Sequence, residues 1–393
     1  MKILYIAHTT DKGGGTIALL NLIDGIRQYH EVAVMLPSKH GWLKDELVQR
    51  NIQCYYAHYY LSIYSLGVIF HAQWWNVKAY LQFVYGTLKK IFFNHRAHNR
   101  LREVIADFQP AVVHCNCGPL AISVNVCRKI YIPHVWHLRE YQGLDFHMVF
   151  MPTTKRFMKL IHQSGNYNIS ITKGVFNHFK LRPKVDQVIY DGVFDYDGTP
   201  MPDEKRDKTI LFVGRIEEAK GVMDLIEAFI SFHQKHPDYQ LKLVGGFSDI
   251  PYLNHCKSVV ERNGLNAYIE FCGECSDIYI RMRKAKCCVV PSHFEGFGFI
   301  TAEAMLNGCL VIGRNTSGTK EQMDRGVELT GSEIALRFTT QKELEHQLEV
   351  AVCNEYYDMR QRAFDVVVKS YTNTQLTSQL CRYYEWIVKR EGQ

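Results

Sequence analysis

Two clusters in the second half of the sequence combine glycines, cations and carboxylates in patterns that suit a diphosphate and a sugar. The first contains Gly214, Arg215, Lys220 and Gly221, directly after the apolar run TILFV at residues 209–213. This order places two cations at the carboxyl end of a predicted strand, where ligands bind in open α/β sheets. A guanidinium fork and an ammonium point charge together can neutralise a leaving diphosphate. A solvated helix start with Glu–Lys pairing is the alternative.

The second cluster is PSHFEGFGFITAEAMLNG, residues 291–308, which follows the apolar run CCVV. Glu295 stands just before a predicted helix, and Glu303 lies inside that helix. Gly296 and Gly298 remove side chains where a ligand can approach the backbone closely. The amide donors and positive dipole end of such a helix suit a diphosphate, so we expect the two carboxylates to accept hydrogen bonds from sugar and ribose hydroxyls. The alternative is that both are surface glutamates, which are common at helix starts.

Strands and helices alternate along the chain and position these clusters at strand ends. Apolar runs predict buried strands at residues 3–7, 31–36, 111–114, 130–136, 209–213, 241–244 and 287–290. Such alternation implies right-handed crossovers and open parallel sheets, and 393 residues exceed one ordinary core. We therefore predict an α/β fold of two Rossmann-like domains. The predicted bounds are 1–194 and 209–372, with a polar linker at 195–208 and a C-terminal helix at 373–393 that packs back on the first domain.

The composition is that of a folded chain with a small excess of positive charge. The hydrophobic fraction is 47% and only 11 residues are proline, which argues against disorder. The net charge of +6 fits anionic ligands or an anionic membrane surface. It is too small to indicate nucleic acid, which we do not expect as a partner.

The twelve cysteines are better explained as reduced thiols than as a disulfide framework. Most lie inside apolar runs, and the start MKILYIAHTTDKGGG has the character of a buried first strand rather than a secretory leader. We therefore expect a cytoplasmic protein. Two close pairs, Cys272 with Cys275 and Cys115 with Cys117, leave a redox or zinc role as the alternative.

Residues 59–100 differ from the rest of the first half. The interval is aromatic and apolar and ends in a basic cluster with Lys89, Lys90, Arg96 and Arg100. Polar residues interrupt it, so a membrane-spanning helix is not expected. Basic residues beside aromatic and aliphatic ones favour peripheral contact with an anionic membrane, on the inner face of the cell membrane. A pair of ordinary helices packed on the first domain is the alternative.

In their order and separation, the two charged clusters resemble the retaining glycosyltransferases of family 4. The fold of that family is of the GT-B type, with two Rossmann-like domains facing across a cleft. Its Glu–x7–Glu motif is matched by Glu295 and Glu303. Its GR…KG donor loop, N-terminal glycine loop and glycine-rich strand end are matched by Gly214, Arg215, Lys220 and Gly221, by Gly13, Gly14 and Gly15, and by Val244, Gly245 and Gly246. The resemblance covers nearly the whole chain and is more specific in the second half.

The resemblance implies a role for individual residues. Arg215 and Lys220 would hold the diphosphate, while Glu303 would bind the ribose and Glu295 the transferred sugar. His137, in VWHLREY, resembles the family's N-domain histidine near the donor sugar, although its pattern alone fits an ordinary core or turn histidine. Further implied donor contacts are Gly14, Gly15, Gly214, Gly245, Glu274 near the base, and the main-chain amides of Gly296, Phe297, Gly298 and Phe299.

The implied reaction transfers a hexosyl group from a nucleotide-diphosphate sugar, UDP-linked in preference to GDP-linked, with retention of configuration. The acceptor is a hydroxyl of a glycan or lipid-linked glycan, as in cell-surface polysaccharide synthesis. No Asp–x–Asp stands where a metal site would be needed, so we expect neither a metal nor another cofactor. Ser317 and Asp191 depart from the family pattern, which has Gly and Asn there. A sugar-nucleotide epimerase of the same fold and a catalytically silent nucleotide-sugar-binding subunit are the alternatives.

Overall fold

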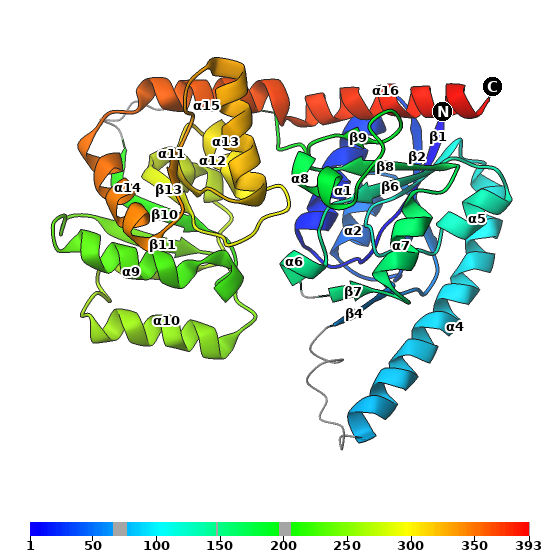
Figure 1. Cartoon of the computed structure of the whole chain (residues 1–393), viewed down its shortest axis with the longest axis horizontal. Helices are drawn as coiled ribbons and strands as arrows, with labels where there is room; N and C mark the ends of the chain where they lie inside the picture. Colours follow the sequence, from blue (N-terminus) through cyan, green and yellow to red (C-terminus); the bar gives the residue numbers. More distant parts are fainter. Residues whose placement is uncertain (66–76, 147, 196–205, 393) are drawn as a thin grey trace. The chain divides into compact units, whose positions relative to one another are not determined.

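The computed structural model describes residues 1–65, 77–146, 148–195 and 206–392 (Figure 1). Contacts divide the chain into two compact units. We call Met1–Gly192 together with Asn373–Gln393 the N-terminal unit, and Val193–Thr372 the C-terminal unit. Most of the predicted linker, residues 196–205, lies outside the described residues. Its end was predicted wrongly, because Asp207 and Lys208 already belong to strand β10.

The N-terminal unit is built on a seven-stranded sheet in the order β3-β2-β1-β5-β6-β8-β9. The strands are β1 Lys2–Ile6, β2 Glu31–Leu36, β3 Gln53–Tyr56, β5 Val112–Cys115, β6 His134–Leu138, β8 Asn166–Ser170 and β9 Gln187–Val188. All neighbouring strands of this sheet pair in parallel. The strand predicted at residues 130–136 starts later, because Tyr131 has a positive φ of 57° and interrupts extended structure. An antiparallel pair, β4 Ile63–Ser65 with β7 Met148–Phe150, lies beside it.

Helices connect these strands and cover the sheet. They are α1 Gly14–Ile26, α2 Trp42–Gln49, α4 Val77–Phe108, α5 Val124–Lys129, α6 Gly143–Phe146, α7 Thr154–Ile161, α8 Lys173–His178 and α16 Asn373–Glu391. β1 and β5 are buried on both faces, as their continuous apolar sequence predicts. Of residues 59–100, Ile63–Ser65 belong to strand β4 and the part from Val77 onward belongs to the single helix α4, while residues 66–76 lie outside the described residues. Within the described parts of the chain, no helix is both long and apolar enough to cross a membrane.

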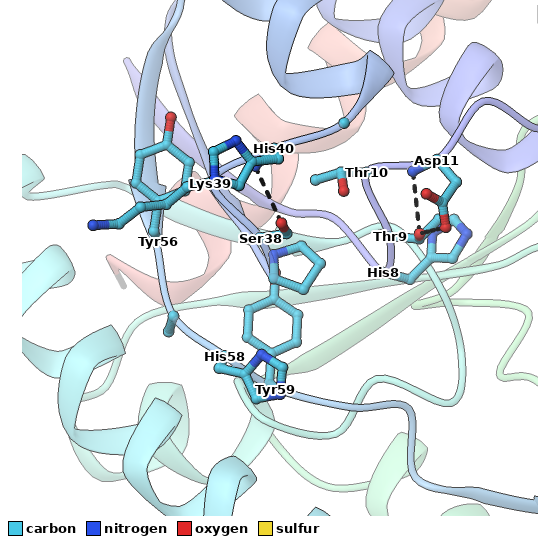
Figure 2. A pocket seen from close by; sticks show the side chains of 13 residues that line it. His8, Thr9, Thr10, Asp11, Ser38, Lys39, His40, Tyr56, His58 and Tyr59 are labelled. Atoms are coloured by element: carbon cyan, nitrogen blue, oxygen red, sulfur yellow. Dashed lines mark hydrogen bonds between the residues drawn. The ribbon is translucent and has the colours of Figure 1, made fainter.

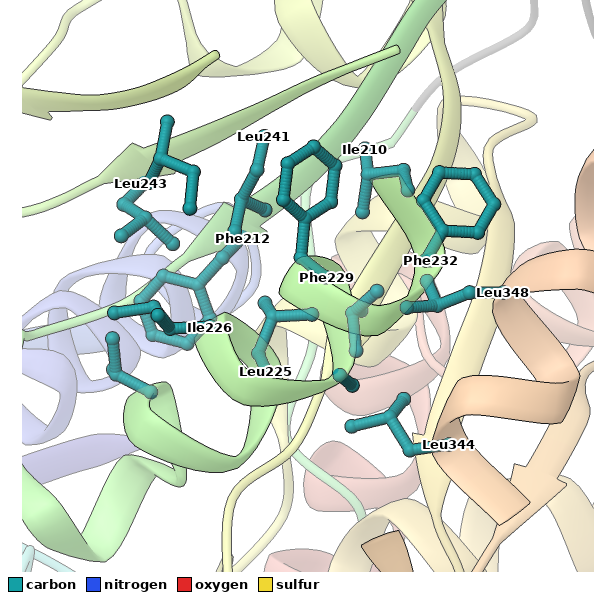
Figure 3. Close-up of a cluster of buried hydrophobic side chains, with 14 of the residues drawn as sticks. Ile210, Phe212, Leu225, Ile226, Phe229, Phe232, Leu241, Leu243, Leu344 and Leu348 are labelled. Atoms are coloured by element: carbon teal, nitrogen blue, oxygen red, sulfur yellow. The ribbon is translucent and has the colours of Figure 1, made fainter. Parts of the chain in front are cut away.

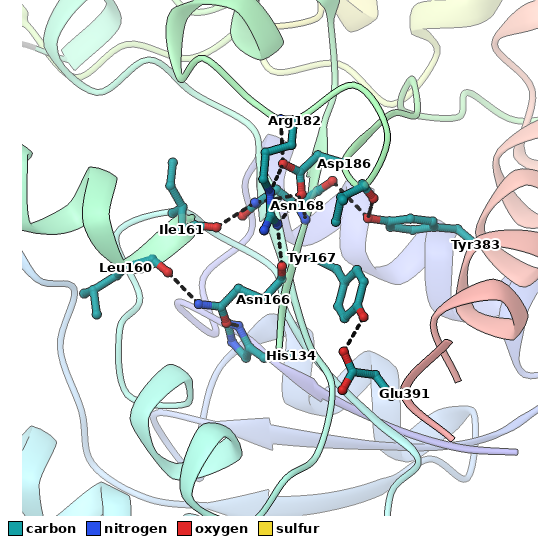
Figure 4. A network of polar contacts seen from close by, with 11 residues as sticks. His134, Leu160, Ile161, Asn166, Tyr167, Asn168, Arg182, Asp186, Tyr383 and Glu391 are labelled. Atoms are coloured by element: carbon teal, nitrogen blue, oxygen red, sulfur yellow. Dashed lines mark hydrogen bonds and ion pairs between the residues drawn. The ribbon is translucent and has the colours of Figure 1, made fainter. Parts of the chain in front are cut away.

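The C-terminal helix α16 packs against α1 and is fixed to β8 by polar contacts. Figure 4 shows this network: the Tyr383 hydroxyl donates to the Val185 carbonyl at 2.8 Å, and Tyr167 donates to the carboxylate of Glu391. Leu380, Tyr384 and other apolar residues of α16 enter the core of the unit. Burial of each such large apolar side chain contributes roughly 1.5–3 kcal/mol to folding. The last helix is therefore an integral layer of the N-terminal unit.

The C-terminal unit repeats the architecture on a six-stranded parallel sheet in the order β12-β11-β10-β13-β14-β15. The strands are β10 Asp207–Val213, β11 Gln240–Val244, β12 Ile269–Gly273, β13 Ala285–Val290, β14 Leu310–Arg314 and β15 Leu336–Phe338. The helices are η2 Glu218–Lys220, α9 Val222–His233, α10 Ile250–Arg262, α11 Ile278–Lys284, α12 Phe299–Leu306, α13 Ser317–Thr330, α14 Gln341–Cys353 and α15 Tyr357–Ser370. Figure 3 shows the apolar face of α9 packed on β10 and β11 through Leu225, Phe229 and Phe212. This core holds the loops at the strand ends rigidly in place.

All twelve cysteines are free thiols. Burial raises the pKa of Cys115 to about 12, and burial likewise raises the pKa of Cys272 to about 11. Both thiols are therefore protonated at neutral pH and are poor nucleophiles. Among the described residues, no group of three His, Cys, Asp or Glu side chains is arranged to hold a metal ion.

Candidate active site

Backbone hydrogen bonds join the carboxyl ends of β10, β11 and β12 in the C-terminal unit. The amide of Gly214 donates to the Val244 carbonyl at 2.9 Å, and the amide of Gly245 donates to the Gly273 carbonyl at 2.8 Å. Gly245 has a φ of 144°, and a Cβ there would lie only 1.9 Å from the carbonyl oxygen of Gly214. Only glycine fits this position, so Gly214 and Gly245 bring two loops into direct contact.

The two charged clusters meet at this edge of the sheet. Lys220 Nζ lies 2.7 Å from Glu295 Oε1, although the two residues are 75 positions apart in the sequence. Their side chains are 25% and 20% exposed, so the pair is accessible from one side. The backbone supports the contact, because the amide of His293 donates to the Ala219 carbonyl at 3.0 Å. The loop after β10 and the loop after β13 therefore form one surface.

The backbone around Glu295 is held by the start of α13. The Glu295 amide donates to Ser317 Oγ at 2.8 Å, and the Gly318 amide donates to the Glu295 carbonyl at 3.0 Å. Ser317 has a φ of 41°, a region that costs a non-glycine residue of order 1 kcal/mol. The hydroxyl contact offsets that cost and explains why serine suits a position where the family pattern has glycine.

The glycine-rich turn before α12 is fixed by a buried amide. Gln322 Nε2 donates to the carbonyls of Phe297 and Gly298 at 2.7 and 3.0 Å. The Phe297 ring is buried and packs on Phe299 and Tyr371. The side chain of Phe297 therefore belongs to the core, and its backbone is the part that stays suited to the predicted donor contact.

Glu303 lies on α12 beside Tyr279 of α11. The Tyr279 hydroxyl donates to Glu303 Oε1 at 3.2 Å. Burial raises the pKa of Glu303, while the hydrogen bond from Tyr279 partly opposes that shift. A carboxylate in such surroundings gains from hydroxyl donors, which fits the predicted contact with a ribose. Tyr279 is a neighbour that the sequence pattern did not single out.

Arg215 and Glu274 lie on the loops beside the Lys220–Glu295 pair. Arg215 Nη1 forms an ion pair with Glu217 Oε1 at 2.9 Å, and the Ser248 hydroxyl donates to the same carboxylate at 2.7 Å. The Arg215 side chain is 58% exposed, so it is accessible to an anion. Glu274 lies against the glycine strand end, since a Cβ on Gly246 would be 2.7 Å from its Oε1. Glu217 was not predicted, and its position two residues after the arginine is the only sequence signal for it.

The predicted histidine of the N-terminal unit lies in a different environment. His137, at the end of β6, is fully buried, and its Nδ1 lies 3.2 Å from His114 Nε2 and 3.3 Å from Arg139 Nη2. Burial and the Arg139 charge hold the pKa of His137 well below its usual range, so the ring is neutral. His137 Nε2 is buried without a hydrogen-bond partner among the described residues. A buried polar atom of this kind is costly unless a ligand satisfies it.

The neighbours of His137 decide which of its nitrogens carries the proton. Arginine only donates, so Arg139 makes Nδ1 the acceptor and leaves the proton on Nε2. His114 agrees with this assignment, because its Nδ1 lies 2.5 Å from the Tyr384 hydroxyl and accepts from it, which leaves a proton on its Nε2 to donate to His137. The Tyr5 hydroxyl lies 3.0 Å from the Tyr384 hydroxyl and is the last member of this series of hydrogen bonds. The network therefore orients His137 as a neutral Nε2–H donor.

Arg139 also connects His137 to the N-terminal glycine loop. Its Nε donates to Asn116 Oδ1 at 3.2 Å, and Asn116 Nδ2 donates to the Gly15 carbonyl at 3.0 Å. The buried carboxylate of Asp191 forms an ion pair with Arg139, which explains why an acid suits the position where the family pattern has Asn. Gly14 begins α1 in open space, while a Cβ on Gly15 would lie 3.0 Å from the His8 ring.

A cavity of about 950 Å³ opens at the carboxyl ends of β1, β2 and β3. Figure 2 shows its polar lining, with Asp11 after β1, Lys39 and His40 after β2, and His58 after β3. The Tyr59 hydroxyl donates to carbonyls that follow or end β1 and β2, at 2.7 and 2.9 Å, and so fixes the wall. The sequence patterns did not single out these residues. The signal that could have found this cavity is the presence of polar residues directly after three consecutive strands.

The C-terminal unit carries a recognisable family signature. Residues 201–363 match the family Glycosyl transferases group 1. The match agrees with the predicted enzyme class, a glycosyltransferase. Both charged clusters lie inside the matched segment.

Curated relatives of the family are similar over part of the chain. A D-inositol 3-phosphate glycosyltransferase of Corynebacterium jeikeium is 32% identical over 130 residues, which are 31% of this chain and 30% of that protein. An uncharacterized glycosyltransferase of Methanocaldococcus jannaschii is 35% identical over 196 residues, 49% of this chain and 52% of that protein. The chain thus spans about a third to a half of the length of these relatives.

Nearly the whole chain shares its fold with a solved structure. Anabaena Alr3699/HepE in complex with UDP has a TM-score of 0.75 at 18% identity, over 98% of this chain and 100% of that chain. The same Anabaena protein in complex with UDP-glucose gives a TM-score of 0.72. The predicted α/β fold of the GT-B type, with two Rossmann-like units, is confirmed.

The structure brings some predicted residues together and leaves others in separate groups. The C-terminal unit gathers the loops that carry Arg215, Lys220, Gly245, Glu274 and Glu295 at one sheet edge. The N-terminal unit gathers Gly15 and His137 around Asn116 and Arg139. The role of each of these residues stays a prediction.

Proposed function

We propose that the protein is a retaining, metal-independent glycosyltransferase. It transfers a hexosyl group from a UDP-sugar to a hydroxyl of a glycan or lipid-linked glycan, in the synthesis of cell-surface polysaccharide. The observation that carries this proposal is the contact between Lys220 and Glu295. It sets a cation for phosphate beside a carboxylate for sugar hydroxyls, inside the segment that matches the family.

In the proposed reaction, the bond between the anomeric carbon and the diphosphate oxygen breaks, and a bond to the acceptor oxygen forms on the same face. Lys220 and Arg215 stabilise the negative charge of the departing diphosphate, a contribution that grows as the bond breaks. The acceptor proton passes to the departing phosphate. Glu295 accepts hydrogen bonds from the sugar, and Glu303 accepts them from the ribose.

His137 serves as a hydrogen-bond donor rather than a base in this proposal. Its neutral ring and the assigned Nε2–H are suited to a sugar hydroxyl oxygen, and the network behind it fixes the ring orientation. A group that stays neutral across the working range of pH cannot add its own titration to the rate profile. His137 is therefore proposed to position the donor sugar.

The acceptor is proposed to bind in the cavity with Asp11, Lys39, His40 and His58 in its lining. Cationic and hydrogen-bonding groups there suit an acceptor that carries hydroxyls and negative charge. Lys39→Gln and His40→Gln should raise KM for the acceptor and leave the binding of UDP unchanged. A loss of UDP binding in either variant would assign the cavity to the donor instead.

Three measurements test the function. A thermal-shift series with UDP-sugars and GDP-sugars should raise Tm for the true donor, since a ligand of the native state stabilises it. Release of nucleotide in the presence of an acceptor pool, with the product anomer read by NMR, tests transfer and retention. Incubation with the donor alone separates an epimerase, which changes the sugar without any acceptor.

The proposed independence of metal is tested by EDTA. Activity should persist after EDTA treatment and desalting, because Arg215, Lys220 and the start of α12 supply the positive charge. Complete loss that Mn²⁺ restores would contradict this part of the proposal. The transferase assignment would then stand with a metal-dependent mechanism.

A further inference from the structure

The N-terminal half of α4 exposes a row of large apolar side chains. Its exposed members are Val77, Tyr80, Leu81, Val84, Tyr85, Leu88, Ile91 and Phe92. Leu81, Tyr85 and Leu88 are 65%, 70% and 60% exposed. Their spacing of three and four residues places them on one side of the helix. Exposed apolar patches of this size mark a surface that contacts something else.

The opposite side of α4 already has its partners in the N-terminal unit. Lys90 donates to the Ile63 carbonyl at 2.7 Å, and the Phe83 ring lies 5.0 Å from that of Tyr64. Toward the C-terminal end, Leu101 and Phe108 are buried in the unit. Figure 1 shows that the N-terminal half of α4 extends away from the sheet. The apolar row is therefore not the face that packs the helix on its own domain.

A row of cations runs along one edge of the apolar side. Lys78, Lys89, Arg96 and Arg100 are separated by 11, 7 and 4 residues, each close to a whole number of helical turns. Arg96 lies 5.7 Å from the Phe92 ring, so the two rows are in contact. The sequence has no Asp or Glu between Glu46 and Glu103. The surface therefore complements a negative partner over its whole length.

This charge pattern decides which occupant suits the apolar row. A second copy of the chain would place one cationic row against another, and among these cations Arg100 alone has a carboxylate beside it in the described structure, that of Glu103 at 2.7 Å, so like charges oppose association. A nucleic acid offers negative charge but no large apolar surface. The headgroups and acyl chains of an anionic bilayer offer both. Tyrosine at the border, as with Tyr85, is typical of such an interface.

We propose that Val77–Arg100 of α4 is a docking surface for an anionic lipid bilayer. Leu81, Val84, Leu88 and Ile91 enter the acyl boundary, and the cationic row contacts the headgroups. This proposal stands independently of the proposed function. It also places the proposed acceptor cavity near the bilayer. A second cavity of about 500 Å³ lies beside α4, is lined by Arg96 and Arg100, and shares Ala57 and His58 with the larger cavity.

Vesicle flotation tests the docking surface with the full-length chain. The protein should float with vesicles of phosphatidylcholine and phosphatidylglycerol at low salt, and much less with phosphatidylcholine alone. Raised salt should reduce flotation, because exposed charges are screened. Failure to float with the anionic vesicles at low salt would overturn the proposal.

Variants separate the apolar and the cationic contributions. Leu81→Gln with Leu88→Gln should lower vesicle partitioning at least tenfold, and each of Lys78→Gln and Lys89→Gln should lower it about fivefold. Tyr29→Gln with Val48→Gln removes two exposed apolar residues elsewhere on the N-terminal unit and should leave partitioning unchanged. Equal partitioning of the Leu81/Leu88 variant and the wild type would overturn the role of α4.

Two further measurements identify the other outcomes. Dimers in sedimentation that the Leu81/Leu88 variant abolishes, without flotation, would show that a second copy covers α4 and would overturn the bilayer proposal. A thermal shift with UDP is measured on every variant, since α4 residues are not among the proposed donor contacts. Loss of flotation with UDP binding intact contradicts only the docking surface, and flotation without UDP binding contradicts only the proposed function.

Discussion

The two units present their candidate polar residues in opposite electrostatic settings. In the C-terminal unit, Lys220, Glu295 and Arg215 are charged, partly exposed and carried by loops at strand ends. In the N-terminal unit, His137 and His114 are buried and neutral, with their protons placed by a chain of hydrogen bonds. The same fold thus offers one site built on charge and another built on fixed, neutral donors.

This difference indicates how the work of the reaction is divided. A diphosphate that gains charge in the transition state is stabilised by nearby cations. A sugar ring is uncharged. Neutral hydrogen-bond donors can orient it without attracting the diphosphate, as a cation in the same position would. In the proposed reaction, the C-terminal unit therefore supplies charge stabilisation, and the N-terminal unit supplies orientation and the acceptor cavity. Substitutions in the two units should differ in size and in kind.

The largest effect is expected for Lys220→Ala. Loss of one donor to the leaving diphosphate should lower kcat by about 10²–10³. The variant should stay folded, because the Lys220–Glu295 pair is partly exposed and its loss costs about 1–2 kcal/mol of unfolding free energy. Steady-state kinetics with the donor found by thermal shift, and urea unfolding of the same preparation, give both numbers.

The matched control is Lys235→Ala. Lys235 forms an ion pair with Glu349 at 2.5 Å on the same unit, and its side chain is 65% exposed. Its loss should change neither kcat nor stability by a measurable amount. Near-normal turnover of folded Lys220→Ala protein would remove the diphosphate contact, and with it the contrast between the units.

The second effect is steric and is expected for Gly245→Ala. The new Cβ would meet the Gly214 carbonyl at 1.9 Å in a backbone conformation that alanine adopts poorly. The steric clash and the backbone strain together should lower the free energy of unfolding by about 3 kcal/mol or more. The clash should also displace the loop that carries Arg215. The free energy of unfolding, measured with denaturant, and the rise in Tm on addition of UDP should both decrease.

Gly264→Ala separates strain from this contact. Gly264 also has a positive φ, of 68°, but a Cβ there meets open space. It should cost about 1 kcal/mol and leave UDP binding intact. Equal losses in the two variants would show that Gly245 serves only the backbone conformation.

A smaller loss is expected for His137→Ala. Removal of an oriented neutral donor should lower kcat/KM about 10-fold to 100-fold, less than the loss of a charge partner of the diphosphate. Tyr384→Phe removes the hydroxyl that fixes His114 but preserves packing, so this variant should lower kcat/KM less than His137→Ala does. Kinetics at several pH values should show no new titration, since His137 stays neutral.

His134→Ala controls for the loss of a buried histidine on the same strand. His134 is buried between Ser123 and Asn166, and burial lowers its pKa to about 4. Its loss should reduce stability by a similar amount and leave kcat/KM of the remaining folded protein near normal. If both variants lose the same activity, His137 acts only through stability.

The sequence predicted which residues lie together better in the C-terminal unit than in the N-terminal unit, for a physical reason. Arg215, Lys220 and Glu295 follow apolar strands directly, and parallel strands bring their carboxyl ends to one edge. That rule alone is enough to bring the loops that carry these three residues to one edge of the sheet. The cavity residues Lys39 and His58 obey the same rule, but their local sequence has no motif that separates binding from ordinary solvation.

Partners that act across the fold could not be read from the sequence. Ser317 contacts Glu295 through a hydroxyl, whereas the sequence pattern marks this serine only as a departure from glycine. Asp191 is likewise a departure from the pattern, and the buried Arg139 explains it. Both depend on tertiary contacts between segments 22 and 52 residues apart, which local spacing does not encode.

The smallest effect concerns the pH dependence of donor binding through Glu303. Burial raises the pKa of Glu303, so its carboxylate, the proposed acceptor from the ribose, becomes protonated at a higher pH than an ordinary glutamate does. Donor affinity, measured by calorimetry, should fall as pH decreases through that raised pKa. Glu303→Gln should remove this acid limb, whereas Glu349→Gln at an exposed ion pair should keep it.

Tyr279→Phe sharpens the test, because Tyr279 donates to the ionised form of Glu303. Without that hydrogen bond the pKa of Glu303 rises further, and the acid limb should move to higher pH by about half a unit to one unit. The stability effect has the opposite sign. Since the folded state favours protonated Glu303, its ionised form destabilises the protein at neutral pH, and Glu303→Gln should raise Tm there. An acid limb that stays in place in both variants would assign the ribose contact to another group.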